Sequence, residues 1–427
     1  MILAYRILTT LIYPFLFIFL YCRKIVKKED PIRFREKILA SHFNVNRKEN
    51  SKLIWFLAAS IGEFKSIIPL IKNLNNERNN LEFIITTTTL SSGNLAKVEL
   101  KNIDNVHHRY FPFDVDFLIN KFLLLWKPDI IFFVDSEIWP NLIFKANKYK
   151  IPLALINARI TTKSFNRWIK FPNTAKKIFS LFNLCLSSNL ETKKYLKELS
   201  ARNIFFNGNI KLIEKIEIHK IKNQNEKILL KKRFWVAAST HKDEEILCLK
   251  THSKLKKEYK DIITIIAPRH IERSKSIKTL SEAFNFNVQI LDKNEIILDN
   301  KEIVIINSFG DLQNFYKYAK SVFIGKSTIR KIKNDSGQNP IDAAKLKCKI
   351  YHGPYVYNFK EIYDILKKNN ISKIIKDEEE LSNNLIADLE YPHKQDDEIE
   401  NKINNLGEKT LTDTMKYINN FLFNEIK

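Results

Sequence analysis

Two segments in the first half of the chain place carboxylates directly after apolar runs, where an acid or a base could work. Glu63 lies in the segment Trp55–Phe64, in which small residues separate an apolar run from the start of a helix. Asp135 and Glu137 follow the apolar run Ile130–Val134. Such a carboxylate can abstract a proton or position a hydroxyl, but it can equally cap a helix or complement the helix dipole. The spacing leaves both interpretations open.

A lysine farther along could supply positive charge. Lys211 stands in the tripeptide Asn209-Ile210-Lys211, directly after Gly208. Its ammonium could neutralise a phosphate group. In a lysine-rich chain, a solvated lysine is the simpler alternative.

Three segments in the second half suit an anionic ligand. Arg269 follows Pro268 at the end of an apolar run, and a guanidinium offers a rigid fork of donors to phosphate or carboxylate. The segments 308–312 and 335–342 each open a helix, whose N-terminal N–H groups attract anions. Together they resemble a nucleotide pocket. Neither GxxxxGK[ST] nor a proper GxGxxG occurs, and no convincing D-x-D pair follows a strand, so P-loop, dinucleotide and metal-bridged sugar-nucleotide sites are not indicated.

The four cysteines stand far apart, with no CxxC pair and no Cys/His cluster at metal-ligand spacing. They indicate a reducing compartment and neither a disulfide framework nor a metal site. No cofactor is predicted.

Apolar, β-branched runs must position these residues. They alternate with amphipathic stretches and fall into two sets, which indicates an α/β fold of two Rossmann-like halves with parallel sheets and a ligand cleft between them. The first set is 53–58, 83–87, 130–134, 153–157, 184–187 and 204–207, and the second is 234–238, 262–267, 288–291, 303–306, 321–324 and 349–352.

The chain has only 8 glycines in 427 residues. Six of them are expected at strand ends or in the loops that follow, namely Gly62, Gly208, Gly310, Gly325, Gly337 and Gly353. Gly93 and Gly407 fit ordinary turn or helix-end positions.

The polar, charged segment 211–232 separates the two sets and predicts a linker. We expect an N-terminal domain at 23–210, a C-terminal domain at 233–395 and a helix at 396–427 that packs back across the linker.

The first 22 residues predict a membrane anchor. The near-apolar run Ile7–Cys22 contains Pro14 and is followed by Arg23, Lys24, Lys27 and Lys28. A cleaved signal peptide is disfavoured because the small-residue cleavage site is missing. A signal anchor or shallow membrane helix is favoured over a buried core helix, and the basic residues would keep the protein body on the cytoplasmic side.

The formal net charge of +23 raises the possibility of a nucleic-acid binder. The charges are spread along the whole chain and no RNA- or DNA-binding signature occurs, so this class is disfavoured. Drift toward AT-rich codons explains much of the charge, and attraction to anionic lipids is a further use for it.

Eight segments in order resemble the family of transferases that move 3-deoxy-D-manno-octulosonic acid (Kdo) from CMP-Kdo onto lipid A precursor. They are WFLAASIGEF, VDSEIWPNL, INARIT, GNIKL, WVAASTHKDEE, APRH, GDL and GQNPIDAA. The resemblance spans nearly the whole chain. It implies an inverting, metal-independent GT-B glycosyltransferase on the cytoplasmic face of the inner membrane, with CMP-Kdo as donor, lipid A precursor (lipid IVA) as acceptor and no nucleic-acid partner.

The resemblance also implies roles for individual residues. Glu63 matches the general base, and Glu137 and Lys211 match residues that stabilise the transition state. The segments that match CMP-contacting positions are Pro268 and Arg269, then Gly310, Asp311 and Leu312, and then Asn339, Pro340, Ile341 and Asp342.

Three places depart from the family pattern. Lys326 stands where the family usually has the second glycine of a pair, Gln338 replaces a histidine, and Asp342 replaces a glutamate. These changes bear on donor affinity. The alternative within the fold class is a membrane-associated GT-B enzyme that uses a UDP-sugar and a lipid acceptor.

Overall fold

The structure is a computed structural model that describes residues 2–48, 50–78, 80–308, 310–331, 336–391 and 397–425. The chain forms two compact units, Met1–Glu214 with Leu406–Lys427, and Lys215–Asn405. Phe309 and Asp335, within two of the predicted nucleotide-binding loops, and Asp396, where the C-terminal helix was expected to begin, lie outside the described residues.

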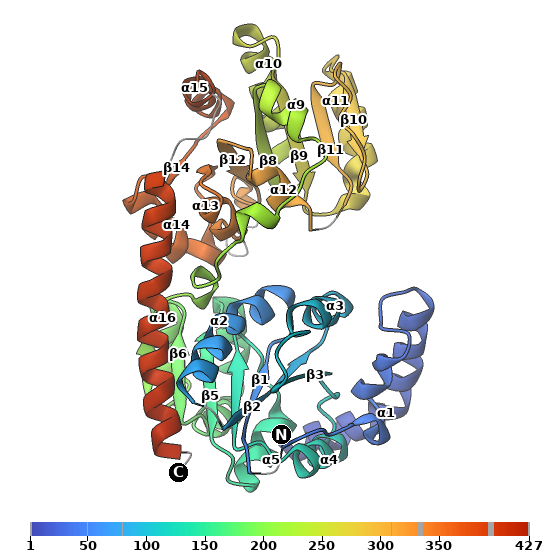
Figure 1. Cartoon of the computed structure of the whole chain (residues 1–427), viewed down its shortest axis with the longest axis vertical. Coiled ribbons are helices and arrows are strands. Elements are labelled where there is room, and N and C mark those ends of the chain that lie inside the picture. Colours follow the sequence, from blue (N-terminus) through green and yellow to red (C-terminus); the bar gives the residue numbers. More distant parts are fainter. Residues whose placement is uncertain are drawn as a thin grey trace. The chain divides into compact units, whose positions relative to one another are not determined.

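The first unit is built on a parallel sheet of seven strands in the order β3-β2-β1-β4-β5-β6-β7 (Figure 1). Its strands are β1 (Lys52–Leu57), β2 (Leu81–Thr87), β3 (Val106–Tyr110), β4 (Ile130–Val134), β5 (Leu153–Ala158), β6 (Leu184–Ser187) and β7 (Ile204–Phe206). The central strands are apolar at nearly every position because helices cover both faces of the sheet.

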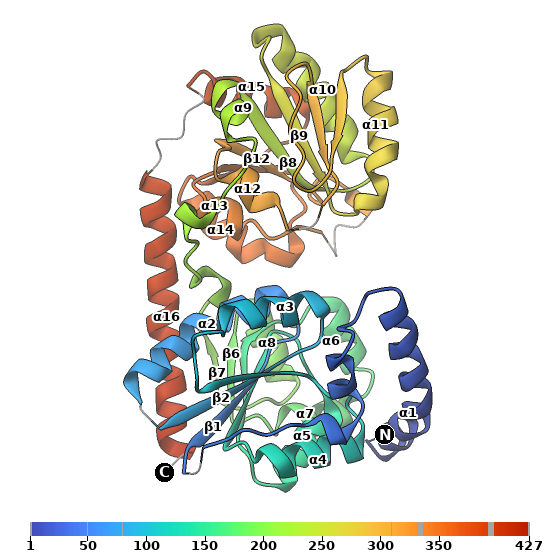
Figure 2. The same ribbon diagram turned by 45° about the vertical axis from the view of Figure 1, so that its right-hand side comes forward.

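The helices of this unit are α1 (Ile2–Ile25), α2 (Ile61–Glu77), α3 (Leu90–Glu99), α4 (Asp116–Trp126), α5 (Pro140–Lys148), α6 (Thr162–Trp168), α7 (Pro172–Phe179), α8 (Leu190–Glu198) and α16 (Asp397–Glu425), of which the part from Leu406 on belongs here. Most of them connect successive strands, whereas α1 precedes β1 and α16 follows the last helix of the second unit. Helices α2 and α16 lie on one face of the sheet, and α4, α5 and α7 lie on the other (Figure 2). Their buried side chains form a separate hydrophobic cluster on each face.

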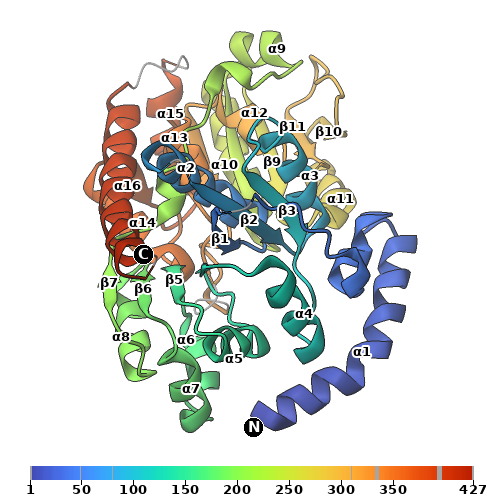
Figure 3. The same ribbon diagram turned by 60° about the horizontal axis from the view of Figure 1, so that its bottom comes forward.

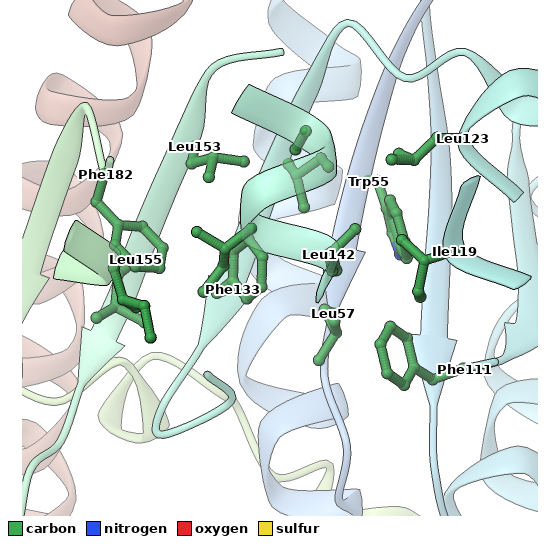
Figure 4. Close-up of a cluster of buried hydrophobic side chains, with 14 of the residues drawn as sticks. Trp55, Leu57, Phe111, Ile119, Leu123, Phe133, Leu142, Leu153, Leu155 and Phe182 are labelled. Atoms are coloured by element: carbon green, nitrogen blue, oxygen red, sulfur yellow. The ribbon is translucent and has the colours of Figure 1, made fainter. Parts of the chain in front are cut away.

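Side chains of successive strand residues point alternately into the hydrophobic clusters on the two faces of the sheet. Trp55 and Leu57 of β1 point into the cluster that also contains Phe133 and Leu142, as Figure 4 shows. Their neighbour Phe56 points to the opposite face, where its ring stacks on that of Phe132 at 4.9 Å. Both faces of the central strands are therefore fixed, which holds the strand ends rigidly.

The second unit has the same construction. Its parallel seven-stranded sheet has the order β10-β11-β9-β8-β12-β13-β14. The strands are β8 (Phe234–Thr240), β9 (Ile263–Pro268), β10 (Val288–Leu291), β11 (Ile303–Ile306), β12 (Ser321–Ile324), β13 (Lys349–His352) and β14 (Ser372–Ile374). The helices are α9 (Glu226–Lys231), α10 (Glu244–Glu258), α11 (Ser274–Ala283), α12 (Leu312–Tyr316), α13 (Ile341–Lys345), α14 (Lys360–Lys368) and α15 (Glu378–Leu389). The predicted α/β class with two Rossmann-like, parallel-sheet halves is confirmed.

Helix α1 is long and apolar enough to cross a membrane. It bends near its middle, where Pro14 removes a helical hydrogen bond (Figure 3). One stripe of the helix faces the first unit: the Tyr5 hydroxyl donates to Asp114 (2.9 Å) and the Tyr13 hydroxyl donates to the carbonyl of Ile38 (2.8 Å). Many other apolar side chains of α1, Leu11 and Phe15 among them, are exposed.

Three glycines do not have the positions that the sequence suggested, and one of them, Gly62, lies in the first turn of α2 and not in the loop before it. Gly93 lies inside α3, where a Cβ atom would meet the Tyr110 hydroxyl at 2.1 Å, and Gly407 lies inside α16, where a Cβ atom would meet the Leu212 carbonyl oxygen at 2.6 Å. Both are glycines because a neighbouring group approaches the helix closely, so the turn and helix-end interpretation was wrong.

Candidate active site

The strand order of the first unit reverses between β1 and β4, and the predicted carboxylates follow these two strands. From β1 the chain passes through α2 to β2 on one side, and from β4 it passes through α5 to β5 on the other. The loops at the carboxyl ends of the strands diverge at such a point and leave a crevice, which is the usual ligand position in open parallel sheets. Glu63 is carried by α2, and Asp135 and Glu137 lie between β4 and α5.

Glu63 belongs to a capping box at the start of α2. The backbone N–H of Glu63 donates to the Ser60 hydroxyl oxygen (3.3 Å), and the Glu63 carboxylate reaches back over the loop. Its Oε2 accepts from the N–H of Ala59 (2.7 Å) and Ser60 (3.4 Å), and its Oε1 accepts from the Ser60 hydroxyl (2.9 Å). The helix-capping alternative is therefore realised, and it orients the carboxylate at the same time.

The environment of Glu63 makes it a stronger base than an ordinary glutamate. Burial raises its pKa, and the nearby Asp135 carboxylate raises it further. The Ser60 hydroxyl, the Lys211 ammonium and the Ala59 N–H act in the opposite direction. A glutamate residue that is 9% exposed and whose proton affinity is increased can accept a proton from a hydroxyl.

Lys211 is fixed by an ion pair with Asp135. Its Nζ donates to Asp135 Oδ2 (2.8 Å), and a Cβ atom on Gly62 would lie 3.8 Å from Lys211 Cε, so the lysine lies beside the start of α2. Asp135 itself has a positive φ of 62°, a backbone conformation that residues other than glycine adopt only at a cost in free energy.

The segment that carries Lys211 is held by an asparagine from a neighbouring strand. Lys211 lies in a short 3₁₀ helix, η3 (Ile210–Leu212). The Asn157 side-chain oxygen accepts from the N–H of Ile210 (3.1 Å), and the N–H of Arg159 donates to the Asp135 carbonyl (3.2 Å). The segment 156–161, which had no predicted role, therefore buttresses both partners of the ion pair.

Glu137 supplies a second titratable carboxyl. The Trp139 indole N–H donates to its Oε2 (2.8 Å). Burial raises the pKa of Glu137 to about 7, with Glu63 the next contribution in the same direction. The raised pKa makes the protonated form of this carboxyl available near neutral pH, and in that form it can serve as a hydrogen-bond donor.

The structure thus brings the three predicted residues Glu63, Glu137 and Lys211 into one cluster in the first unit. Asp135 joins them as the partner of Lys211, a role that sequence reasoning missed. The arrangement offers a base, a carboxyl that can donate, and a fixed cation.

The other predicted residues follow three strands of the second unit at the same edge of its sheet. Pro268 ends β9 and is buried, whereas Arg269 is exposed and its N–H donates to the Thr240 carbonyl (3.0 Å). Gly310 has a φ of 88°, Asp311 accepts from the Ser308 hydroxyl, and Leu312 begins α12.

The last predicted segment contacts the one after β11. The Asn339 side chain accepts from the N–H of Ile341 (3.1 Å), and Pro340 and Ile341 are buried. Asp342 accepts from the Gln313 side chain (3.1 Å), which ties α13 to α12.

Sequence reasoning also missed a buried carboxylate in the second unit, where the strand order reverses between β8 and β12. Glu244 accepts from the N–H groups of Lys326 (2.6 Å), Ser327 (2.9 Å) and Thr328 (3.1 Å). Lys326 has a φ of 56°, which explains why glycine suits this position. Glu244 lies within the segment WVAASTHKDEE, but its spacing does not reveal a partner about eighty residues away.

Among the described residues, no group of three or more His, Cys, Asp or Glu side chains is placed to hold a metal ion.

Comparisons with known proteins agree with this arrangement. Residues 33–213 match the family model for 3-deoxy-D-manno-octulosonic-acid transferase (kdotransferase). The chain is 31% identical over 387 residues to the 3-deoxy-D-manno-octulosonic acid transferase of Rickettsia bellii, covering 89% of each protein. It is 30% identical over 382 residues to a probable mitochondrial 3-deoxy-D-manno-octulosonic acid transferase of Arabidopsis thaliana, covering 86% of this chain and 82% of the relative.

Among solved structures, the UDP-GlcNAc 2-epimerase of Neisseria meningitidis superposes with a TM-score of 0.57 at 14% identity. The match covers 86% of this chain and all of the epimerase, and it supports the two-unit GT-B fold alone. Together with the two close sequence relatives, these findings lead to one conclusion: the chain belongs to the 3-deoxy-D-manno-octulosonic acid transferase family and is a glycosyltransferase.

Proposed function

We propose that the protein transfers Kdo from CMP-Kdo to the lipid A precursor lipid IVA, with inversion at the anomeric carbon and without a metal ion. The observation that carries the proposal is the cluster of Glu63, Glu137 and the Asp135–Lys211 pair at the strand reversal of the first unit. Membership of the Kdo transferase family supplies the substrate class.

Glu63 acts as the general base. It takes the proton of the acceptor hydroxyl while the hydroxyl oxygen forms a bond to the anomeric carbon of Kdo and the bond from that carbon to the CMP phosphate oxygen breaks. CMP leaves with the bonding electrons, and the proton stays on Glu63. A carboxylate has about four lone-pair directions, so Oε1, which accepts from the Ser60 hydroxyl, can still receive the acceptor proton.

Glu137 and Lys211 stabilise charge as the reaction proceeds. A protonated Glu137 can donate a hydrogen bond to an oxygen that gains negative charge, and its raised pKa supports this role. Lys211 offers its ammonium to an anionic group of the donor. Asp135 keeps that ammonium in place between reactions.

Residues of the second unit bind the donor nucleotide. We assign this role to Pro268, Arg269, Gly310, Asp311, Leu312, Asn339, Pro340, Ile341 and Asp342. The exposed Arg269 and the N–H groups of the loops after β11 and β12 suit a single phosphate, which needs less countercharge than a pyrophosphate does. Neutralisation by protein groups is the reason for proposing metal independence.

The protein works at the cytoplasmic face of the inner membrane, where α1 anchors it. The exposed apolar side chains of α1 and the basic residues that follow support contact with lipid, because the first can enter the bilayer and the second attract anionic headgroups.

Incubation of the purified protein with CMP-Kdo and lipid IVA, followed by mass spectrometry of the lipid, tests the proposal. We expect a mass increase equal to one or more Kdo residues, and no product from UDP-sugars. Product from a UDP-sugar, with none from CMP-Kdo, would overturn the proposed donor.

A further inference from the structure

Lys37 is a buried lysine outside the cluster of Glu63, Glu137, Asp135 and Lys211. It ends η1 (Arg33–Lys37), and its side chain is only 7% exposed. Its Nζ forms an ion pair with Glu29 and donates to the carbonyl of Thr88 (2.7 Å). An ammonium costs several kcal/mol to bury unless partners compensate, so a lysine at this position calls for a physical reason.

Thr88, which Lys37 contacts, is hydrogen-bonded to the loop that follows β1. Thr88 lies just after β2, the strand that pairs with β1 in parallel. Its backbone N–H and its hydroxyl both donate to the carbonyl oxygen of Ala59, each at 3.2 Å. The Ser92 hydroxyl donates to the same oxygen at 3.2 Å. Three donors therefore fix the direction of the peptide group that joins Ala59 to Ser60.

That peptide group points its opposite end at Glu63. Its carbonyl faces Thr88, and its N–H, which belongs to Ser60, faces Glu63 Oε2 at 3.4 Å. The preceding N–H, that of Ala59, donates to the same carboxylate oxygen at 2.7 Å. Hydrogen bonds to the carbonyl of a peptide group polarise the N–H of the same group, so the three donors to the Ala59 carbonyl strengthen the bond from the Ser60 N–H to Glu63. The Thr88 carbonyl that Lys37 holds belongs to a different peptide group, so Lys37 acts by fixing the position of Thr88.

We propose that Lys37 is a positioning residue for Glu63. By holding the Thr88 carbonyl, Lys37 fixes the loop whose two N–H groups orient the Glu63 carboxylate toward the acceptor hydroxyl. The proposal rests on the role of Glu63 as base in the proposed function. Lys37 does not touch the substrate in this scheme; it acts through Thr88 and Ala59.

Lys37 and Glu63, which lie at the two ends of this series of contacts, have different charged neighbours. Lys37 faces Glu29, whose carboxylate also pairs with Arg23 of α1 (2.7 Å), and it lies 5.0 Å from the centre of the Tyr110 ring. Asp30 is a further charged neighbour of Lys37.

Glu63 faces Asp135, Glu137 and Lys211. A substitution of Lys37 leaves these three groups in place. A change in the proton affinity of Glu63 in a Lys37 variant is then attributable to the contacts that run from Lys37 through Thr88 and Ala59 to Glu63.

The variant Lys37→Met tests the proposal through the pH dependence of kcat/KM with CMP-Kdo and lipid IVA. Weaker N–H bonds stabilise the Glu63 anion less, so its pKa rises and the acidic limb of the profile moves to higher pH. We expect this limb to move by roughly half a pH unit and kcat at pH 7 to fall about tenfold, and part of this difference from wild type should disappear at higher pH. Lys37→Arg keeps a charged donor, so its pH profile and kcat should lie between those of the wild type and those of Lys37→Met.

A matched control is Lys145→Met, which removes the ion pair (2.9 Å) between Lys145 of α5 and Asp116 of α4 in the same unit. This variant should keep the wild-type pH profile. A folded Lys37→Met protein with an unchanged profile and unchanged kcat would overturn the proposal.

If Lys37→Met does not fold because it leaves Glu29 buried without this partner, the double variant Lys37→Met with Glu29→Gln answers the same question, because it removes both charges of the ion pair. An unchanged profile in that variant also overturns the proposal. Failure of the proposed base is distinguishable: Glu63→Gln would then retain turnover, whereas failure of the positioning role alone leaves Glu63→Gln inactive and Lys37→Met normal.

Discussion

Glu63 and Glu244 occupy comparable positions in the two sheets. Each lies in the first turn of the helix that follows the strand at which the strand order reverses, α2 after β1 and α10 after β8. Glu63 turns back onto its own loop and accepts from Ala59 and Ser60. Glu244 also accepts from its own loop, through the N–H of His241 (3.0 Å), but in addition it reaches the loop after β12 and accepts from three successive backbone N–H groups and the Thr328 hydroxyl.

The two carboxylates therefore differ in their capacity to take up a proton from a substrate. Glu244 is 1% exposed and its oxygens are occupied by donors of the protein, so it serves to join two loops. Glu63 has fewer donors and lies near Asp135 and Glu137, which disfavour its charge. A carboxylate saturated with donors holds structure, whereas one that is buried with fewer donors and near like charges can take up a proton.

The largest expected effect comes from Glu63→Gln. Glutamine can replace glutamate in a capping box, so the fold should remain, but it cannot accept the proton. We expect transfer of Kdo to fall roughly 1,000-fold, which is the usual scale for losing a general base. Steady-state rates with CMP-Kdo and lipid IVA measure this, and a thermal melt within a degree or two of wild type verifies the fold.

Retention of near-normal turnover in Glu63→Gln would contradict the comparison, because the two glutamates would then both be structural. Glu63→Asp, which keeps the carboxylate but shortens the side chain by one methylene, should retain more activity than the glutamine variant.

Glu244→Ala should affect stability more than chemistry. The change leaves the N–H groups of Lys326, Ser327 and Thr328 without their acceptor in a buried site. Each buried group that loses its partner costs about 1–3 kcal/mol, so we expect the second unit to lose roughly 3 kcal/mol or more. Differential scanning calorimetry measures the loss. A melting temperature equal to that of wild type would show that the N–H groups find other partners.

Most of the fold could be predicted from the sequence, because buried parallel strands are continuous apolar runs. Every predicted strand overlaps an observed one. The two strands that were missed, β3 and β14, lie at sheet edges and contain polar residues such as His108 and Lys373. Edge strands face solvent on one side and do not need the apolar pattern.

The candidate site was only partly predictable. Glu63, Glu137 and Lys211 stand out through their motifs, but the pairing of Lys211 with Asp135 joins residues 76 positions apart. The contact of Glu244 with Lys326 spans 82 positions. Such contacts depend on which strands become neighbours, and the spacing of residues along the chain does not encode that order.

The pH profile should show a smaller effect that separates Glu137 from Glu63. Transfer needs Glu63 deprotonated and, in the proposed mechanism, Glu137 protonated. Because the pKa of Glu137 is raised to about 7, activity should fall as the pH rises beyond that value. The fall should be about tenfold for each further pH unit.

Glu137→Gln carries a permanent N–H donor and should lose this alkaline limb while keeping the acidic one, which follows from the raised pKa of Glu63. The two carboxyls interact, so the limbs of the wild-type profile belong to the pair. An alkaline limb that persists in Glu137→Gln would assign it to another group.

The smallest expected effect is that of chelation. Carboxylate oxygens are common ligands of divalent cations, and a Glu63 that bound one would be a ligand and not a base. In the structure Asp135 Oδ2 is taken by Lys211 and Glu63 Oε2 by the Ala59 N–H, so protein donors already occupy these oxygens. We expect the rate of transfer to change by less than about twofold after incubation with EDTA, which is near the limit of a rate assay. A loss of activity that Mg²⁺ restores would show that the cluster binds a metal. The difference between a reactive Glu63 and a structural Glu244 would then depend on metal coordination and not on proton affinity.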